Sequence, residues 1–385
     1  MLNKLTKKKI DDLRQIIVGK VSDPRSQVEQ ITNGLLYKFI SDMDEKSISQ
    51  GGVASFFVNS YEKYKWENLI HNQISGEEKV KLYADALEKF YFNENLPELF
   101  RQIFKNSTLP YKDPSVFNKF LKLINEFEYT NSESLGDAFE YLLSFMGKQG
   151  EAGQFRTPRH IIDFIVEIIN PQKEEKILDP ASGTAGFLIS AYKKIIQSNT
   201  KNNSGDLLSS EDLTKLTSNL VGYDISPEFL KVSLMNMYLH NITNPKIFEY
   251  DTLSSDAKWN EYFDIILANP PFFSPKGGIT PHNRFSVKSK KAEILFLDYI
   301  VEHLKPSGKA GVIVPEGIIF DGEKGYCQIR KKLVESSLIG VISLPKGIFQ
   351  PYSPVKTNIL IIDKKLKKNR ENIFFIKIDN DGFSL

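Results

Sequence analysis

The residues best suited to chemistry are the four of Asn269-Pro-Pro-Phe272, which directly follow the apolar segment 264–268. Because proline has a fixed φ and no backbone N–H, a strand's hydrogen-bond ladder must stop at Pro270 and Pro271. The side-chain oxygen of Asn269 and the carbonyl of Pro270 can then accept both protons of one planar amino group, and Phe272 can stack on its ring. The motif indicates either a site that makes an amine nucleophilic or a rigid turn after a buried strand.

A second candidate site is the segment Asp179-Pro-Ala-Ser-Gly-Thr-Ala-Gly186, whose glycines let a ligand approach the backbone. It lacks the Gly-Lys-Ser/Thr ending of a phosphate loop. It also lacks the Gly-Xaa-Gly of a dinucleotide fingerprint, and the next acid that ends a strand, Asp224, comes too late for one. The segment therefore predicts a ligand with an adenosine but no phosphate, and S-adenosylmethionine fits.

Acidic residues that end predicted strands extend this cofactor site. Asp224 can accept hydrogen bonds from both ribose hydroxyls, and Asp251 can accept one from the adenine amino group. Asp179 is expected near the sulfonium and amino groups, where it offsets their positive charge. Each acid alone is more often a solvated strand end, but their order upstream of Asn269 favours a cofactor site.

A helix start upstream offers a place for the cofactor's carboxylate. Thr157 is suited to cap a helix that begins at Pro158 and runs to Ile169, which leaves free amides at a positive dipole end. The amides around Phe155–Thr157 can bind the methionine carboxylate. The alternative is an ordinary capped helix start.

The elements that position these residues alternate between strands and helices from about residue 174 onward. Such alternation predicts an α/β fold with a doubly wound, mainly parallel sheet, whose ligands bind beyond the carboxyl ends of the strands. Strands are expected at 176–179, 220–224, 247–251, 263–268, 310–314, 338–343, 358–362 and 374–378, and helices at 185–197, 227–239, 291–304 and 326–337. The polar segment 198–218 is expected to be an inserted loop, and the lysine run 364–368 a solvated turn.

The N-terminal part, residues 1–147, reads as a helical domain because its apolar residues recur at helical spacing. A glycine-bearing polar linker is expected at 148–153, within a catalytic domain that covers 148–385.

Composition excludes several classes of protein. Apolar content of 41%, charged content of 25% and a net charge of +2 are ordinary for a globular protein, so any contact with nucleic acid must come from local patches. The single cysteine, Cys327, excludes an internal disulfide framework and a cysteine zinc site. No signal peptide or long apolar run is present, which predicts a cytoplasmic protein without membrane contact.

The motifs together resemble those of amino-methyltransferases that methylate adenine in DNA. Nearly the whole chain, including Leu135-Gly-Asp-Ala-Phe-Glu-Tyr-Leu-Leu143, Val314-Pro-Glu-Gly317 and the segment 344–358, is similar to the modification subunit of type I restriction-modification systems. The resemblance implies cofactor contacts at Gln154, Phe155, Arg156, Thr157, Pro158, Arg159, Ser182, Gly183, Thr184 and Asp224. It implies target-base contacts at Asn269, Pro270 and Phe272.

The resemblance also implies partners. These are double-stranded DNA, from which the target base must be flipped out, a specificity subunit that reads the DNA sequence, and a second copy of the chain; a restriction subunit stays open. Three departures stand out: Arg156 where an aromatic residue often follows Phe155, Asp224 where glutamate is common, and an end at Leu385 before the helical tail usual in such subunits.

Further observations bear on the substrate. The loop 274–292 carries five cations and no acid before Glu293, and we expect either a clamp on the DNA backbone or a solvated surface loop; the cations are Lys276, Arg284, Lys288, Lys290 and Lys291. The chemistry needs no metal, because the cofactor carries the electrophile. Two alternatives stay open: methylation of a protein glutamine amide, and a non-catalytic scaffold that binds cofactor and DNA.

Overall fold

The computed structural model describes residues 4–71, 73–127, 132–143, 145, 157–272, 278–350, 354–369 and 371–382. The chain forms two compact units. The helical unit comprises Met1–Gln149 together with Leu234–Asn241, and the sheet unit comprises Gly150–Ser233 together with Ile242–Leu385. The whole of the linker expected at 148–153 lies outside the described residues.

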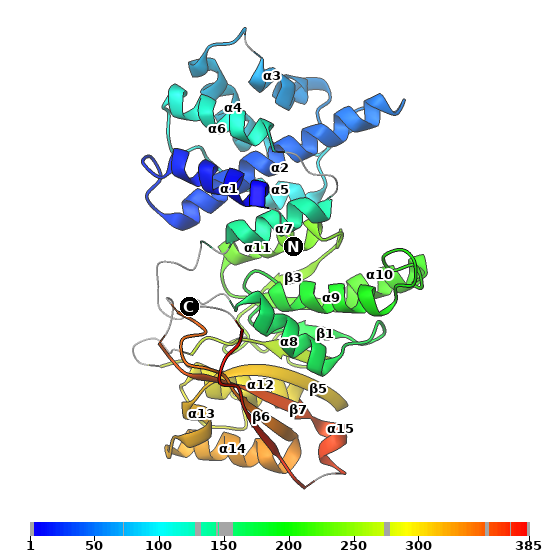
Figure 1. Cartoon of the computed structure of the whole chain (residues 1–385), viewed down its shortest axis with the longest axis vertical. Coiled ribbons are helices and arrows are strands. Elements are labelled where there is room, and N and C mark those ends of the chain that lie inside the picture. The colour runs from blue at the N-terminus through cyan, green and yellow to red at the C-terminus, as the bar shows by residue number, and fades with distance from the viewer. Residues whose placement is uncertain are drawn as a thin grey trace. The chain divides into compact units, whose positions relative to one another are not determined.

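The helical unit is built around a cluster of aromatic side chains. The ring of Tyr37 lies 5.4 Å from Trp66, 5.5 Å from Tyr83 and 4.7 Å from Phe90, between centroids, and edge-to-face pairs of this kind add to the energy of burial. The elements are α1 (Lys4–Ile17), α2 (Pro24–Ser49), a 3-10 helix (Asn59–Tyr64), α3 (Trp66–Ile70), α4 (Gly76–Phe90), α5 (Glu98–Phe104), α6 (Pro114–Asn125) and α7 (Ser132–Leu143), as Figure 1 shows.

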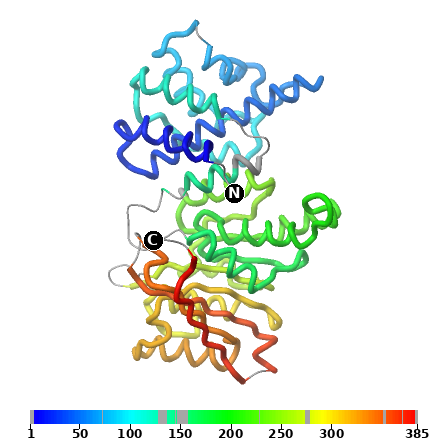
Figure 2. The backbone as a smooth tube through the Cα atoms, in the orientation of Figure 1, coloured from blue at the N-terminus to red at the C-terminus, as the bar shows by residue number. Residues whose placement is uncertain are grey.

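The sheet unit contains one eight-stranded sheet in the order β3-β2-β1-β4-β5-β7-β6-β8. The strands are β1 (Ile177–Asp179), β2 (Leu220–Asp224), β3 (Lys246–Glu249), β4 (Phe263–Ala268), β5 (Leu304–Pro315), β6 (Leu338–Ser343), β7 (Thr357–Asp363) and β8 (Phe374–Lys377). All neighbours pair in parallel except β7, which runs antiparallel to both β5 and β6. The last strands, orange to red in Figure 2, lie side by side. The predicted mainly parallel sheet is confirmed.

Helices cover both faces of the sheet. Val312 and its alternate neighbours on β5 join a core with residues of α12 and α14. Gly311 points the other way, where an added Cβ would lie 2.4 Å from Ile165 of α8. The helices are α8 (Arg159–Ile169), α9 (Gly186–Ser198), α10 (Ser210–Asn219), α11 (Pro227–Leu239), α12 (Ala292–His303), α13 (Gly317–Phe320), α14 (Lys324–Ser336) and α15 (Lys364–Lys367). The placement of α12 and α14 on one face and of α8 on the other makes the sheet doubly wound.

Three local expectations were wrong. Helix α8 begins at Arg159, with Pro158 at the cap position and no side-chain cap, so Thr157 does not cap it. The later part of the expected loop 198–218 belongs to α10, which a capping box between Ser209 and Asp212 starts. The lysine run forms the short helix α15 because the Asp363 side chain accepts from the Leu366 amide and caps it.

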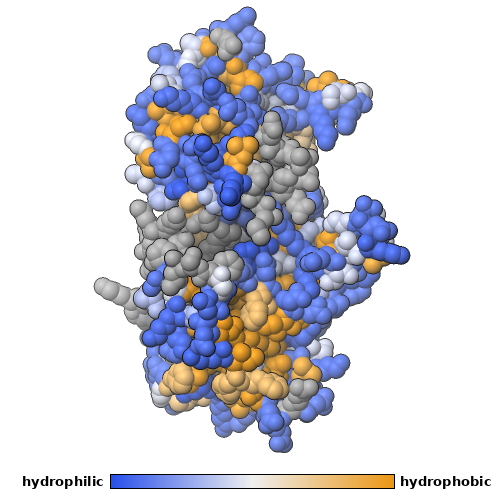
Figure 3. All heavy atoms as spheres, in the orientation of Figure 1, coloured by the Kyte–Doolittle hydropathy of each residue, from blue (hydrophilic) through white to orange (hydrophobic). Residues whose placement is uncertain are grey.

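The edge strand β8 leaves apolar side chains exposed. Phe374, Phe375 and Ile376 are 55%, 73% and 53% exposed, and Figure 3 shows apolar residues gathered on the sheet unit. β8 pairs only with β6, so its other edge has no strand partner among the described residues. Within the described part of the chain, no helix is both long and apolar enough to cross a membrane.

Candidate active site

The candidate site lies where the order of strands reverses. From β1 the chain passes to β2 and β3 on one side and then returns to β4 on the other side of β1. The parallel register pairs Leu178 with Ile266, so Asp179 ends β1 and Asn269 follows β4 at the same edge of the sheet. A reversal of this kind opens a crevice beyond the carboxyl ends of the strands. The two motifs predicted to carry the chemistry therefore follow adjacent strands at this edge.

Asn269 has a fixed side-chain amide. Its Nδ2 donates a hydrogen bond to Thr157 Oγ1 at 2.9 Å. Its Oδ1 is buried and has no hydrogen-bond partner among the described residues. A desolvated acceptor without a donor costs about 1–3 kcal/mol, and a donor amino group at this position removes that cost. The amide thus presents an acceptor and holds its own donor out of the way.

Phe272 lies at the end of this motif and is only partly buried. Its ring contacts Phe349 at a centroid distance of 6.4 Å and an interplanar angle of 83°. Phe349 is itself buried, so the edge-to-face contact restrains the ring of Phe272. Of the two prolines that separate Asn269 from Phe272 in the sequence, Pro270 is buried and Pro271 is partly buried.

The loop after β1 is tied to the end of β2. The Ser182 amide donates to the Tyr223 carbonyl at 2.8 Å, and the Gly183 amide donates to Asp224 Oδ2 at 2.9 Å. Gly183 has φ +51°, a conformation that favours glycine. Ser182 Oγ is buried and lacks a partner among the described residues, whereas Thr184 is partly buried. The loop therefore offers an unsatisfied hydroxyl at the place predicted for the cofactor.

Gly222 of β2 allows this close approach. An added Cβ would lie 2.6 Å from Ile247 Cδ1 and 3.0 Å from both Cβ and Oγ of Ser182. No larger residue fits between them without movement, so the glycine sets how near the loop comes to the sheet.

Two neighbouring acids carry the electrostatics of the site. Asp179 is 1% exposed, and its Oδ1 accepts from the Ala181 amide at 3.2 Å. Burial, and then the neighbouring Asp224, raise the pKa of Asp179 to about 8 against that hydrogen bond. Burial also raises the pKa of Asp224, although its carboxylate accepts from the amides of Gly183 and Ser226.

These acids suit a cationic ligand. Within the described residues, neither Asp179 nor Asp224 forms an ion pair with a lysine or arginine. Both carboxylates keep lone pairs for ligand donors. Together with Ser182 Oγ, the donor set fits a ligand that carries hydroxyl groups and positive charge, as S-adenosylmethionine does.

The other predicted cofactor residues are placed less completely. Asp251, after β3, accepts from the amides of Leu253 and Ser254 at 3.0 and 3.2 Å. Arg159 Nε pairs with Asp163 Oδ1 at 3.0 Å. Pro158 occupies the cap position of α8, and Gln154, Phe155 and Arg156 lie outside the described residues.

Two contacts of this site were missed by sequence reasoning. Thr157 orients Asn269 across 112 residues of chain, and Phe349 restrains Phe272 from beyond β6. Neither residue has a local signal for these contacts, because both depend on how the sheet folds.

The basic loop is partly occupied by internal contacts. Arg284 Nη2 donates to Asn260 Oδ1 at 2.9 Å, and Lys291 Nζ pairs with Glu323 at 2.6 Å. Lys288 and Lys290 are exposed, whereas Lys276 lies outside the described residues.

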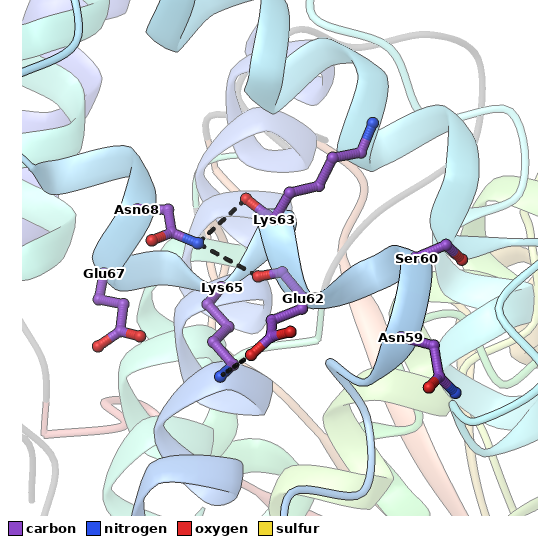
Figure 4. Close-up of a pocket in the computed structure, with 7 residues that line it drawn as sticks. All are labelled: Asn59, Ser60, Glu62, Lys63, Lys65, Glu67 and Asn68. Atoms are coloured by element: carbon purple, nitrogen blue, oxygen red, sulfur yellow. Dashed lines mark hydrogen bonds and ion pairs between the residues drawn. The ribbon is translucent and has the colours of Figure 1, made fainter.

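The helical unit has an open polar depression of about 510 Å³, shown in Figure 4. Its polar groups bond to one another: Asn68 Nδ2 donates to the carbonyls of Glu62 and Lys63, and Lys65 pairs with Glu62 at 3.3 Å. It therefore resembles a solvated surface more than a ligand site.

Comparison with known proteins gives consistent matches. Residues 130–384 match the family model described as N-6 DNA Methylase. The EcoEI methylase subunit of a type I restriction enzyme from Escherichia coli is 30% identical over 319 residues, which are 79% of this chain and 64% of that protein. The EcoKI methylase subunit of Escherichia coli strain K12 is 31% identical over 318 residues, 79% of this chain and 58% of that one. This chain spans less than two thirds of the length of both relatives.

Solved structures match over nearly the whole chain. One, from work on complex assembly and conformational transition of the type I restriction-modification system, has a TM-score of 0.75 and 25% identity, and the match covers 98% of this chain and 77% of that one. The methyltransferase subunit of a type I system from Streptococcus thermophilus has a TM-score of 0.73 and 20% identity over 98% of this chain and 88% of that one. The second likeness supports the fold.

Proposed function

This chain belongs to the N-6 DNA methylase family, and we propose that it transfers a methyl group from S-adenosylmethionine to the exocyclic amino group of adenine in DNA. The family confirms the resemblance predicted from the motifs. The observation that carries the proposal is the buried, unpartnered Oδ1 of Asn269, whose Nδ2 is bonded to Thr157. This oxygen needs a donor, and the adenine amino group supplies one.

The cofactor is held by residues beyond β1, β2 and β3. Asp224 and Ser182 Oγ would meet the ribose and its surroundings, Asp251 the adenine, and segment 154–159 the methionine carboxylate. Asp179, held largely protonated at neutral pH by burial, would ionise beside the cofactor's positive charge. When bound, S-adenosylmethionine supplies an electrophilic methyl group.

The chain's own residues position the amine. The target base is flipped out of the duplex, and Phe272 stacks on it. Asn269 Oδ1 and the Pro270 carbonyl accept hydrogen bonds from the two amino N–H groups. This draws the nitrogen from planar toward tetrahedral geometry and directs its lone pair at the methyl group. Amide and carbonyl oxygens are not bases at neutral pH, so the proton leaves to water after transfer. Positioning supplies most of the acceleration.

The proposed partners follow from the type I relatives. We infer that a specificity subunit reads the DNA sequence and that a second copy of the chain joins the complex. We also infer that this complex acts on double-stranded DNA in the cytoplasm. The exposed Lys288 and Lys290 support a contact with the DNA backbone. Methylation of a protein amide uses the same acceptor platform, but the family match favours DNA.

The test is transfer of labelled methyl groups to unmethylated DNA by the full chain with its specificity subunit. We expect Asn269→Ala to lower turnover by at least about 100-fold, since losing one preorganised polar contact to the reacting group costs about 10²–10³. The affinity for the cofactor should stay within about threefold of the parent value, because the residues proposed to bind the cofactor lie elsewhere.

Substitutions at Thr157 provide the matched pair. Thr157→Val removes the acceptor for Asn269 Nδ2 and should lower turnover, whereas Thr157→Ser keeps the hydroxyl and should retain it. An Asn269→Ala enzyme that methylates at near the parent rate would contradict the proposed role of Asn269.

A further inference from the structure

A second cluster of chemistry-bearing side chains lies in the helical unit, apart from the residues proposed for methyl transfer. Asp137 and Glu140 are one turn apart on α7 and share a face of it. His240 follows directly after α11. One potential ligand atom from each residue lies within 4.8 Å of the other two, and all three residues belong to the same unit.

His240 is the unusual member of this cluster. It is 2% exposed, and neither ring nitrogen has a hydrogen-bond partner among the described residues. Its Nε2 lies 3.6 Å from Glu140 Oε1, which is longer than a hydrogen bond. Buried polar groups nearly always have a hydrogen-bond partner or a bound ion. This imidazole therefore needs a bonding partner that the described residues do not provide.

The backbone of α7 is shaped to receive the ring. An added Cβ at Gly136 would lie 2.9 Å from His240 Cε1 and 3.1 Å from Nε2. The glycine therefore lets the imidazole lie against the helix beside the two carboxylates. At the other end of the contact, Tyr238 of α11 packs edge-to-face on Phe100 of α5, with centroids 4.7 Å apart, which holds the end of α11 in place.

We propose that Asp137, Glu140 and His240 bind a divalent first-row transition metal, with Zn²⁺ the best fit. Ligands at about 2.0–2.2 Å from one zinc ion lie roughly 3–4 Å apart, close to the separation of Nε2 and Oε1. Imidazole selects such metals over Mg²⁺ and Ca²⁺, and two carboxylates balance the charge of the ion inside the unit. The metal would tie the end of α11 to α7 and take no part in methyl transfer.

The experiment uses the full chain after dialysis against a chelator, with ZnCl₂ as the probe. Calorimetric titration should give one strong site, and Zn²⁺ should raise the melting temperature. His240→Gln and Asp137→Asn should each weaken Zn²⁺ binding by at least about 100-fold, more than the loss of an outer contact of a metal site, and should abolish the rise in melting temperature.

His71→Gln is the matched control, because His71 is an exposed histidine of the same unit and should bind Zn²⁺ like the parent. Should His240→Gln fail to fold, the partly exposed and isosteric Asp137→Asn decides the question. The proposal is overturned if the parent shows no strong site, if Asp137→Asn binds Zn²⁺ as tightly as the parent does, or if the site disappears in His71→Gln. An unchanged melting temperature with Zn²⁺ would identify the cluster as an ion pair only.

Discussion

Replacing Asp179 with asparagine should make the protein more stable at neutral pH in the absence of cofactor. Burial, and then Asp224, raise the pKa of Asp179 to about 8 in the folded chain, whereas an unfolded chain ionises near about 3.9. Between these values the folded protein retains a proton that the unfolded chain has lost. Stability from this group is therefore complete below about pH 4 and is lost as the pH rises to about 8.

The magnitude follows from the size of the shift. Each pKa unit is worth about 1.36 kcal/mol. The raised pKa of Asp179 therefore lowers the free energy of unfolding by about 4 kcal/mol at pH 7 and by at most about 6 kcal/mol above pH 8, relative to low pH. The amide introduced by Asp179→Asn would not titrate and would keep an acceptor oxygen for the Ala181 amide, which bonds to Oδ1 of the parent carboxyl at 3.2 Å. The stability of the variant relative to the parent should thus increase between pH 5 and pH 8 and then level off.

The assay can be confined to the sheet unit. The chain has two tryptophans: Trp66 belongs to the helical unit and Trp259 to the sheet unit. In a Trp66→Phe background, Trp259 fluorescence during urea unfolding reports the unit that contains Asp179, which avoids the assumption that both units unfold together. A stability difference that stays flat from pH 5 to pH 9, or a variant less stable than its parent at pH 8, would refute this account of Asp179.

Cofactor binding gives an independent measure of the same group. A carboxyl with a pKa of about 8 is about 90% protonated at pH 7, and a bound cation favours its ionised form. Titration calorimetry at pH 7 in buffers of different ionisation enthalpy should then show release of up to about 0.9 proton, and Asp179→Asn should abolish that release.

Further substitutions, each with a matched control, test three other parts of the structure. Gly222→Ala should cost about 1–3 kcal/mol of stability in urea unfolding and weaken cofactor binding, because its Cβ would lie 2.6 Å from Ile247, whereas Gly340→Ala, with its nearest atom at 3.7 Å, should do neither. Lys332→Met should cost about 3–5 kcal/mol, because Lys332 Nζ lies 2.5 Å from the buried carboxylate of Asp298; Lys331→Met, whose partner Glu335 is exposed, should cost under about 1 kcal/mol. Lys288→Ala and Lys290→Ala should each lower by about one the slope of log affinity for DNA against log salt concentration, and Lys365→Ala should leave the slope unchanged.

The alternation of strands and helices was predictable because each element carries its own periodic signal. The bounds expected for the helix 227–239 agree with α11, and the acids expected at the ends of β1 and β2 lie there. The strand order reverses beside β1, and the edge proposed to bind the ligand was chosen from that alternation. The spacing of apolar residues was enough to predict a helix or strand wherever the burial of one face determines which of the two forms.

Local pattern failed where a side chain has competing partners. Asp212 and Ser209 form a capping box that starts α10 inside a polar segment, and polarity alone suggested a loop there. Leu304 pairs with Phe263 of β4 across a register shift, so β5 begins well before the apolar residues 310–314 that marked it. In both cases hydrogen bonds outweigh the apolar pattern that sequence reasoning weighs most.

Thr157 shows why the order of the motifs has a physical meaning. If Thr157 capped α8, its hydroxyl oxygen would accept a hydrogen bond from an amide of the first turn. The helix begins instead at Arg159, and the hydroxyl oxygen accepts from Asn269 Nδ2. Thr157 belongs to the segment 154–159 that is proposed to meet the cofactor, while Asn269 is proposed to bind the amino group of the substrate. One hydrogen bond therefore joins the two halves of the proposed reaction, so a change that moves either segment should also turn the amide of Asn269 away from its substrate.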